Sequence, residues 1–384
     1  MRDKNIEELL KQQVKEIMNE EQAAASEQRM HSTRSKRRPL KKKKHRFLKA
    51  VGLVAAVLLI AIGLVLGTKS GRRLLYRTAS NFVFSNISTE SKLPDNEDEN
   101  LLPSIEGLRQ EEYVTNYLIF GIEEIGGAKN TDSMMIASIN TKDDTIKLTS
   151  LLRDSYVEIE GYKANKLNSA YSKGGAKLLV DTVEKNYKIK IDGYASVNFE
   201  SFEKIVDLLG GVTIELGKEE AEYLNKTNYI SKKKYRNVKP GVNKLNGNQL
   251  MGYCRVRKVK TLGGANNDYG RVVRQQRALK AIFDSYKTTN IFKLFDITKE
   301  CLGYVNTNLT EKQIALAMES IVENKILTMD TFRIPVDGAF EAPKRYNGIG
   351  YPIVLDWEVN RVELYKFIFN DTEEEAKAAL AELK

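Results

Sequence analysis

Residues 117–156 read YLIFGIEEIGGAKNTDSMMIASINTKDDTIKLTSLLRDSY. Three short runs within this segment, 117–121, 133–140 and 145–152, are rich in isoleucine, leucine and methionine. Apolar runs of this length are typical of buried β-strands. The segment therefore predicts three strands near the start of a folded domain.

Downstream of these strands, the hydrophobic pattern alternates between helix and strand. The predicted elements are a helix at 175–187, a strand at 194–199, a helix at 200–209 that ends at Gly210-Gly211, a strand at 212–216, a helix at 271–286, a helix at 311–323, a strand at 328–334, a helix at 356–369 and a charged helical tail at 371–384. Strands that alternate with helices predict an α/β domain built in layers.

An uncharged apolar run precedes the domain. Residues 50–67 read AVGLVAAVLLIAIGLVLG, and Phe47 and Leu48 extend the run. A helix of this length can cross the hydrocarbon core of a bilayer, so residues 47–67 are predicted to be a transmembrane helix. A cleaved signal peptide is the alternative, but the 46 preceding residues and the lack of a clear A-x-A cleavage site disfavour it.

Charges on either side of the run predict its orientation. Nine lysines and arginines lie between residues 34 and 46, whereas four lie between residues 69 and 77. Positive charge favours the cytoplasmic side. We therefore expect a single-pass protein of the cell membrane with a basic cytoplasmic tail (1–46), an extracytoplasmic linker (68–113) and an exported C-terminal domain.

The net charge of +10 is concentrated in the tail, which contributes +7 and leaves +3 for the other residues. A domain close to neutral argues against nucleic acid as a partner. The two histidines, His31 and His45, both lie in the tail, which excludes a histidine triad or a histidine zinc site in the domain. Cys254 is expected to be a small buried apolar residue, although a disulfide with Cys301 stays possible in an oxidising compartment.

Four polar segments interrupt the apolar pattern. Asp132 lies at the mouth of a predicted strand, where it is either a cleft carboxylate or an ordinary turn residue. Arg153 follows the end of a strand, and its guanidinium either enters a site or pairs with Asp154. In Arg255-Val256-Arg257, alternate residues of an extended segment point the same way, so the two guanidinia are expected to converge.

The fourth segment, DYGRVVRQQ at 268–276, is the most informative. On a helical wheel Gln275 falls inside the apolar stripe and Arg271 lies on its edge. Interior polar side chains are costly unless they meet a polar partner, and a helix N-terminus favours an anion. An internal hydrogen-bond network is the alternative explanation.

These segments together contribute five arginines, at positions 153, 255, 257, 271 and 274. Arginine binds phosphate oxygens with two parallel hydrogen bonds and keeps its charge at physiological pH. One monophosphate does not need so many cations, whereas a pyrophosphate does, and a carboxylate-held magnesium ion could neutralise the remaining charge. The residues thus predict a phosphate site.

The same segments, in order, resemble the LytR-CpsA-Psr family of cell-envelope proteins. The resemblance covers roughly residues 114–287. It is carried by the opening strands and Arg-Asp turn at 117–159, KLNSAY at 166–171 with Gly174-Gly175, VNFESF to LLGGV at 197–212, LNG at 245–247, Arg255-Val256-Arg257, and GRVVRQQ at 270–276. Any one of these motifs is weak, but the ordered set is specific.

The resemblance implies a three-layer α/β/α domain with a central mixed sheet at 114–287, which residues 288–370 extend. It also implies transfer of a glycopolymer, such as a teichoic acid or capsular polysaccharide, from a polyprenyl-pyrophosphate carrier to peptidoglycan, giving a phosphodiester. The implied partners are the lipid-linked glycan, peptidoglycan and membrane lipid, and the implied cofactor is Mg²⁺. An apolar groove for the prenyl chain is also implied, without any indication of which residues line it.

By position, the resemblance implies catalytic roles for Asp132, Arg153 and Arg255. The implied pyrophosphate-binding residues are Arg153, Arg255, Arg257, Arg271, Arg274 and Gln275. Asp132 would hold magnesium or lie near the attacking hydroxyl, and Glu123 would be a second metal ligand.

The sequence departs from the family pattern in one loop. Glu123 stands where the family usually has aspartate, and Ile125 where it usually has arginine. This departure keeps open a second hypothesis, a non-catalytic receptor for the lipid carrier or the wall. A third hypothesis is a membrane-bound transcriptional attenuator, against which the near-neutral domain argues.

Overall fold

The computed structural model describes residues 107–125, 128–287 and 328–383, together with separate positions between 297 and 326. Within these ranges, the side chains of residues 123–129 and 286–287 are not described. The predicted tail, the predicted span and most of the linker lie outside the described residues, as does part of the helix predicted at 311–323. Among the helices that are described, none is long and apolar enough to cross a bilayer.

A mixed sheet forms the centre of the domain, with strand order β10-β3-β2-β1-β6-β9. Its strands are β1 (Val114–Ile125), β2 (Ala128–Asn140), β3 (Thr145–Leu151), β6 (Gly193–Asn198), β9 (Asn306–Thr307) and β10 (Thr328–Ile334). β1, β2 and β3 pair in antiparallel fashion, whereas β6 runs parallel to β1 and β10 runs parallel to β3. The three strands predicted from residues 117–152 are therefore confirmed as neighbours in one sheet.

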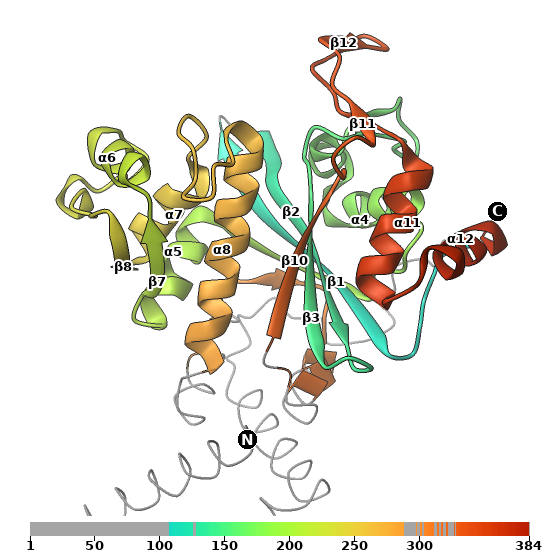
Figure 1. Cartoon of the computed structure of the whole chain (residues 1–384), viewed down its shortest axis with the longest axis horizontal. Coiled ribbons are helices and arrows are strands. Elements are labelled where there is room, and N and C mark those ends of the chain that lie inside the picture. The colour runs from blue at the N-terminus through green and yellow to red at the C-terminus, as the bar shows by residue number, and fades with distance from the viewer. Residues whose placement is uncertain are drawn as a thin grey trace, which may run out of the picture. The chain divides into compact units, whose positions relative to one another are not determined.

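One face of the sheet is covered by α4 (Asn168–Tyr187), α11 (Trp357–Phe369) and α12 (Glu373–Glu382) (Figure 1). Because side chains alternate along a strand, Leu118 and Phe120 of β1 point to this face, where they join a buried core with α4 and α11. The helix predicted at 175–187 begins earlier, at Asn168, with an irregularity at Gly174-Gly175.

The other face carries a second group of elements (Figure 1). These are α5 (Phe199–Leu208), α6 (Lys218–Lys226), α7 (Gly247–Arg255), α8 (Asn267–Lys287), the short 3₁₀ helix η2 (Lys233–Tyr235) and the hairpin of β7 (Val212–Leu216) and β8 (Gly241–Leu245). They enclose a separate buried core. Helices on both faces of a mixed sheet confirm the layered α/β fold.

The C-terminal part completes the sheet, because β10 pairs with β3 along its whole length and α11 packs beneath it. Six small strands form two further features. β4 (Tyr156–Val157) pairs with β5 (Asn165–Lys166), and β11 (Phe340–Glu341), β12 (Arg345–Tyr346), β13 (Ile349–Gly350) and β14 (Val354–Leu355) build a projection between β10 and α11. Residues 328–369 thus belong to the same structural unit as the sheet.

Candidate functional site

A β-bulge places two consecutive residues of β2 at one site. The pairing of β1 with β2 shifts between Gly121 and Ile122, so that Gly121 faces Ser133, Ile122 faces Thr131, and the strand register skips Asp132. An extra residue bends a strand and can redirect a side chain. Asp132 and Ser133, on either side of this shift in register, both line one cavity.

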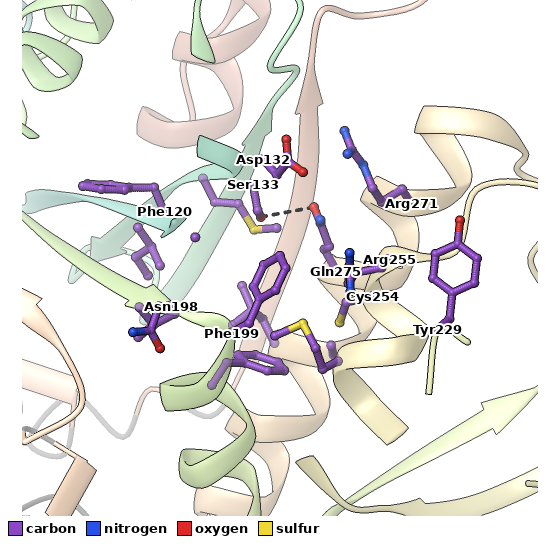
Figure 2. A pocket seen from close by; sticks show the side chains of 18 of the residues that line it. Phe120, Asp132, Ser133, Asn198, Phe199, Tyr229, Cys254, Arg255, Arg271 and Gln275 are labelled. Atoms are coloured by element: carbon purple, nitrogen blue, oxygen red, sulfur yellow. Dashed lines mark hydrogen bonds between the residues drawn. The ribbon is translucent and has the colours of Figure 1, made fainter. Parts of the chain in front are cut away.

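The cavity has a volume of about 360 Å³ and lies between the sheet and the helices α5, α7 and α8 (Figure 2). Most of its wall is apolar. The apolar part is lined by Ile119, Phe120, Met135, Val197, Phe199, Phe202, Tyr229, Met251, Cys254, Ala278 and Leu279. A wall of this kind suits a hydrocarbon ligand rather than a sugar.

Cations gather at the polar part of the same cavity. Arg255, Arg257, Lys258 and Arg271 all line it. Arg255 is the last residue of α7, and its guanidinium lies 4.9 Å from the ring centroid of Phe199. Arg255 and Arg257 both line the cavity, although Arg255 ends a helix and does not belong to the extended segment that the spacing argument assumed.

Arg153 joins this cluster through Asp132. Its Nη1 donates a 2.5 Å hydrogen bond to Oδ1 of Asp132, and both side chains are about one-fifth exposed. Burial lowers the pKa of Arg153, but nearby carboxylates, Asp132 first among them, outweigh this and raise the pKa overall. Arg153 is therefore held as a cation beside the cavity, although it does not line the wall itself.

Arg271, in the first turns of α8, is buried at 4% exposure without a full set of partners. Its Nη2 lies 3.4 Å from Oδ1 of Asp268, and its buried Nε has no hydrogen-bond partner among the described residues. Burial, together with the nearby Arg153 and Arg257 cations, lowers the pKa of Arg271 to about 10. A buried cation among other cations is unfavourable, and an anion in the cavity would relieve that cost.

The structure does not bring Arg274 to the cavity. Its side chain is completely buried, and its Nε donates a 2.7 Å bond to Oε1 of Glu220. Its two terminal nitrogens donate to the backbone carbonyls of Val256, at 3.1 Å, and Val259, at 3.0 Å. The position of Arg274 thus contradicts its predicted role as a direct pyrophosphate ligand, because its guanidinium holds the segment that carries Arg257 instead.

The two glutamines that follow also point different ways. Gln275 lines the cavity and accepts a 3.1 Å hydrogen bond from the hydroxyl of Ser133 (Figure 2). Gln276 donates to Ser150 of β3 and to the carbonyl of Phe332 in β10, which fixes α8 on the sheet. Arg271 and Gln275 are one helical turn apart and so share one face of α8.

The carboxylates at the site allow a limited test for magnesium. Among the described side chains, no three His, Cys, Asp or Glu residues gather closely enough to hold a metal ion. Asp132 is nevertheless a cavity carboxylate, and Mg²⁺ is commonly held by one or two carboxylates together with substrate phosphates. Asp132 therefore fits a metal site shared with a bound phosphate, whereas the side chain of Glu123 lies outside the described residues.

Sequence reasoning did not identify the apolar wall or Lys258, an exposed cation beside Arg257. A basic run at 255–258 was the available signal for Lys258. The expectation for Cys254 is confirmed, because the residue is buried and unpaired, and burial raises its pKa to about 12. Cys301 is also a free thiol.

Comparison with known proteins gives consistent matches. The sequence profile of the LytR_cpsA_psr family matches residues 81–363. Regulatory protein MsrR of Staphylococcus aureus is 31% identical over 258 residues, which are 66% of this chain and 74% of that protein. The polyisoprenyl-teichoic acid–peptidoglycan teichoic acid transferase TagU of Bacillus mycoides is 32% identical over 242 residues, or 62% and 73% of the two chains.

Solved structures of TagT share the fold. TagT bound to LIIa-WTA aligns with a TM-score of 0.54 at 23% identity and covers 73% of this chain and 95% of that one. TagT with bound octaprenyl pyrophosphate lipid aligns with a TM-score of 0.50 at 22% identity over the same shares of the two chains. At these identities the likeness shows the fold alone.

Proposed function

This chain belongs to the LytR-CpsA-Psr family, and we propose on that basis that it transfers a glycopolymer from a polyprenyl-pyrophosphate carrier to a hydroxyl group of peptidoglycan. The names of its relatives support this class of reaction, since TagU is named as a teichoic acid transferase and TagT has been solved with an octaprenyl pyrophosphate lipid. Glycopolymers of the teichoic acid or capsular polysaccharide type are the proposed cargo.

The observation that carries the proposal is the amphipathic cavity. Its walls are mostly apolar, and arginines from α7, α8 and the segment between them also line it. A polyprenyl pyrophosphate has the same division, a hydrocarbon chain joined to a compact polyanion. The cavity therefore favours a lipid with a phosphate head group over a free nucleotide or a sugar, and the family relationship favours this carrier among such lipids.

The arginines suggest how the reaction is promoted. The acceptor oxygen attacks the phosphorus that bears the glycan, and the bond from that phosphorus to the bridging oxygen breaks. Polyprenyl phosphate leaves with the electron pair, and the hydroxyl proton is lost. In this proposal Arg255, Arg257 and Arg271, which line the cavity, stabilise the negative charge that builds on the leaving phosphate in the transition state.

Asp132 has two proposed roles, which remain alternatives. Its carboxylate either accepts the proton of the attacking hydroxyl or helps to hold Mg²⁺, which would withdraw charge from the phosphates when bound. In both cases, the 2.5 Å bond from Arg153 fixes the orientation of the carboxylate. Glu123 is proposed as a second metal ligand on its position in the sequence alone.

The location of the protein is also a proposal. We propose that residues 47–67 anchor the chain in the cell membrane, with the N-terminus in the cytoplasm and the domain outside. The uncharged run and its flanking lysines and arginines support this arrangement. A domain anchored in this way would meet both the lipid carrier and the wall.

The decisive experiment supplies the purified full-length chain, in detergent, with a polyprenyl-pyrophosphate glycan, magnesium and peptidoglycan fragments. Release of polyprenyl phosphate and formation of a phosphodiester are measured. Arg255→Ala should abolish product, whereas Lys260→Ala, which changes an exposed residue that does not line the cavity, should not. Tight lipid binding without product would favour the receptor hypothesis, and neither binding nor product would contradict the proposal.

A further inference from the structure

A hairpin projects from the domain at its C-terminal side. Residues 340–355, which we call the arm, leave the body through β11 and return through β14, and β12 and β13 form the tip around an Asn347-Gly348 turn. Figure 1 shows β12 well away from the body, at the end of the molecule where α8 begins. At the tip, the rings of Tyr346 and Tyr156 meet edge-on with their centroids 5.0 Å apart.

The chemistry of the tip is unusual for a surface loop. Tyr346 is 39% exposed and Tyr351 is 71% exposed, and the exposed cations Lys344 and Arg345 stand beside them. The amide of Asn347 donates to the hydroxyl of Tyr156, so a further polar group lies next to the Tyr346 ring. The tip therefore offers aromatic rings, hydrogen-bonding groups and positive charge together.

The backbone of Tyr351 adopts a conformation that is unfavourable for tyrosine. Its φ is +52°, in the left-handed region where glycine and asparagine are the usual residues. Its backbone N–H donates to the carbonyl of Lys344, and Pro352 follows it. A tyrosine that is mostly in water gains little from burial to offset this backbone cost. An exposed side chain on an unfavourable backbone conformation is more readily explained by ligand binding than by a contribution to folding.

The base of the arm adjoins the segments that carry the arginine cluster. On one side, the N–H of Ile353 donates to the carbonyl of Asp154, which directly follows Arg153. On the other side, the ring of Phe340 lies 6.4 Å from that of Tyr269, two residues before Arg271. The guanidinium of Arg333 covers the same Tyr269 ring at 4.2 Å. The arm is thus fixed to both sides of the phosphate site.

We propose that the arm binds the acceptor polysaccharide and presents its hydroxyl groups to the phosphate site, an inference that rests on the proposed function. Flat tyrosine rings with polar edges suit the faces of sugar rings, and the two cations suit the carboxylates of wall peptides. A membrane surface is a poorer partner, because loops that enter a bilayer need a larger projecting apolar surface, and Ile349 at the tip is partly buried.

The test is co-sedimentation of the purified full-length chain with insoluble peptidoglycan. The double variant Tyr346→Ala/Tyr351→Ala should bind roughly tenfold more weakly than the wild type, since each aromatic contact contributes modestly. The variant Tyr346→Phe/Tyr351→Phe keeps both rings and should retain most of the affinity. Val242→Ala is the matched control, because Val242 is 74% exposed on β8, outside the arm.

Binding of octaprenyl pyrophosphate and thermal melting are measured on every variant, and both should match the wild type. Wild-type affinity for peptidoglycan in the double alanine variant would overturn the inference. The inference would also be overturned if the double alanine variant lost affinity only for vesicles of anionic phospholipid, because the arm would then be a membrane contact. If peptidoglycan binding depends on the arm but the wild-type chain never forms product, the result would support the acceptor-binding role of the arm and contradict the proposed transfer reaction.

Discussion

Replacing Arg274 by methionine tests whether this arginine holds the protein together or touches the ligand. Its side chain and that of Glu220 are both 0% exposed and form a direct ion pair at 2.7 Å. The guanidinium also bonds to the carbonyls of Val256 and Val259, on either side of Arg257. The substitution therefore removes a cation, its ion pair and two hydrogen bonds at once.

The expected loss of folding stability follows from the partners that Glu220 keeps after the substitution. The Glu220 carboxylate stays buried and, among the described residues, keeps the backbone N–H groups of Gly217 and Leu262 as donors. Breaking a buried ion pair by removing one partner typically costs about 3–5 kcal/mol. For a domain of this size, each kcal/mol lowers the melting temperature by about 2–4 °C, so the expected loss is roughly 6–20 °C.

Circular dichroism melting and octaprenyl pyrophosphate titration are measured together. Adding Glu220→Leu to Arg274→Met removes the unpaired carboxylate and should recover much of the stability, whereas affinity should stay at least about tenfold reduced because the carbonyls beside Arg257 still lack a donor. Lys177→Met breaks an exposed ion pair and should cost no more than about 1 kcal/mol. Wild-type melting of Arg274→Met with lost lipid binding would refute the positioning role and restore direct ligation.

Three further substitutions test the cavity. Asp132→Asn should reduce magnesium-dependent turnover more than lipid binding, and equal losses in the two assays would indicate a structural role. Arg271→Met should remove pyrophosphate binding and should stabilise the lipid-free protein by roughly 1–4 kcal/mol in melting experiments. The stabilisation is expected because the pKa of Arg271 falls to about 10 in the folded state, so that at every pH below that value folding disfavours the charged side chain. Leu279→Trp should fill part of the cavity beside its apolar wall. Calorimetry should then show weaker binding of octaprenyl pyrophosphate and unchanged binding of inorganic pyrophosphate.

The sequence predicts the strands where their residues are apolar. It does not predict the parts of a strand that form only because a neighbouring strand continues opposite them. The prediction at 117–121 covers the apolar middle of β1, but the strand continues to Ile125, because β2 continues opposite it to Ala128. Residues 122–131 include glutamates, glycines and a lysine, which no strand pattern would select. The bulge at Asp132 directly follows this polar stretch, so hydrophobic periodicity could not reveal the feature that orients the carboxylate.

The cavity wall could not be predicted for a different reason. Phe199, Met251, Ala278 and Leu279 belong to α5, α7 and α8 and have the composition of ordinary core residues. Whether such residues pack against one another or leave a space depends on how far the helices stand from the sheet. Side-chain type carries no information about that distance.

Two buried arginines one turn apart show how a ligand-binding residue differs from a structural one. The helical wheel placed Arg271 at the apolar edge of α8 but gave no reason to treat Arg274 differently, because its partner Glu220 is 54 residues away in the sequence. A buried charge must be neutralised, and within the described structure Arg274 has a buried carboxylate and two carbonyls for this purpose. Arg271 has a 3.4 Å contact with a partly exposed aspartate and a buried Nε without a partner. We therefore expect an anion from outside the protein to balance much of the charge of Arg271, which is why we assign the pyrophosphate to Arg271 and its cavity neighbours rather than to the whole arginine set.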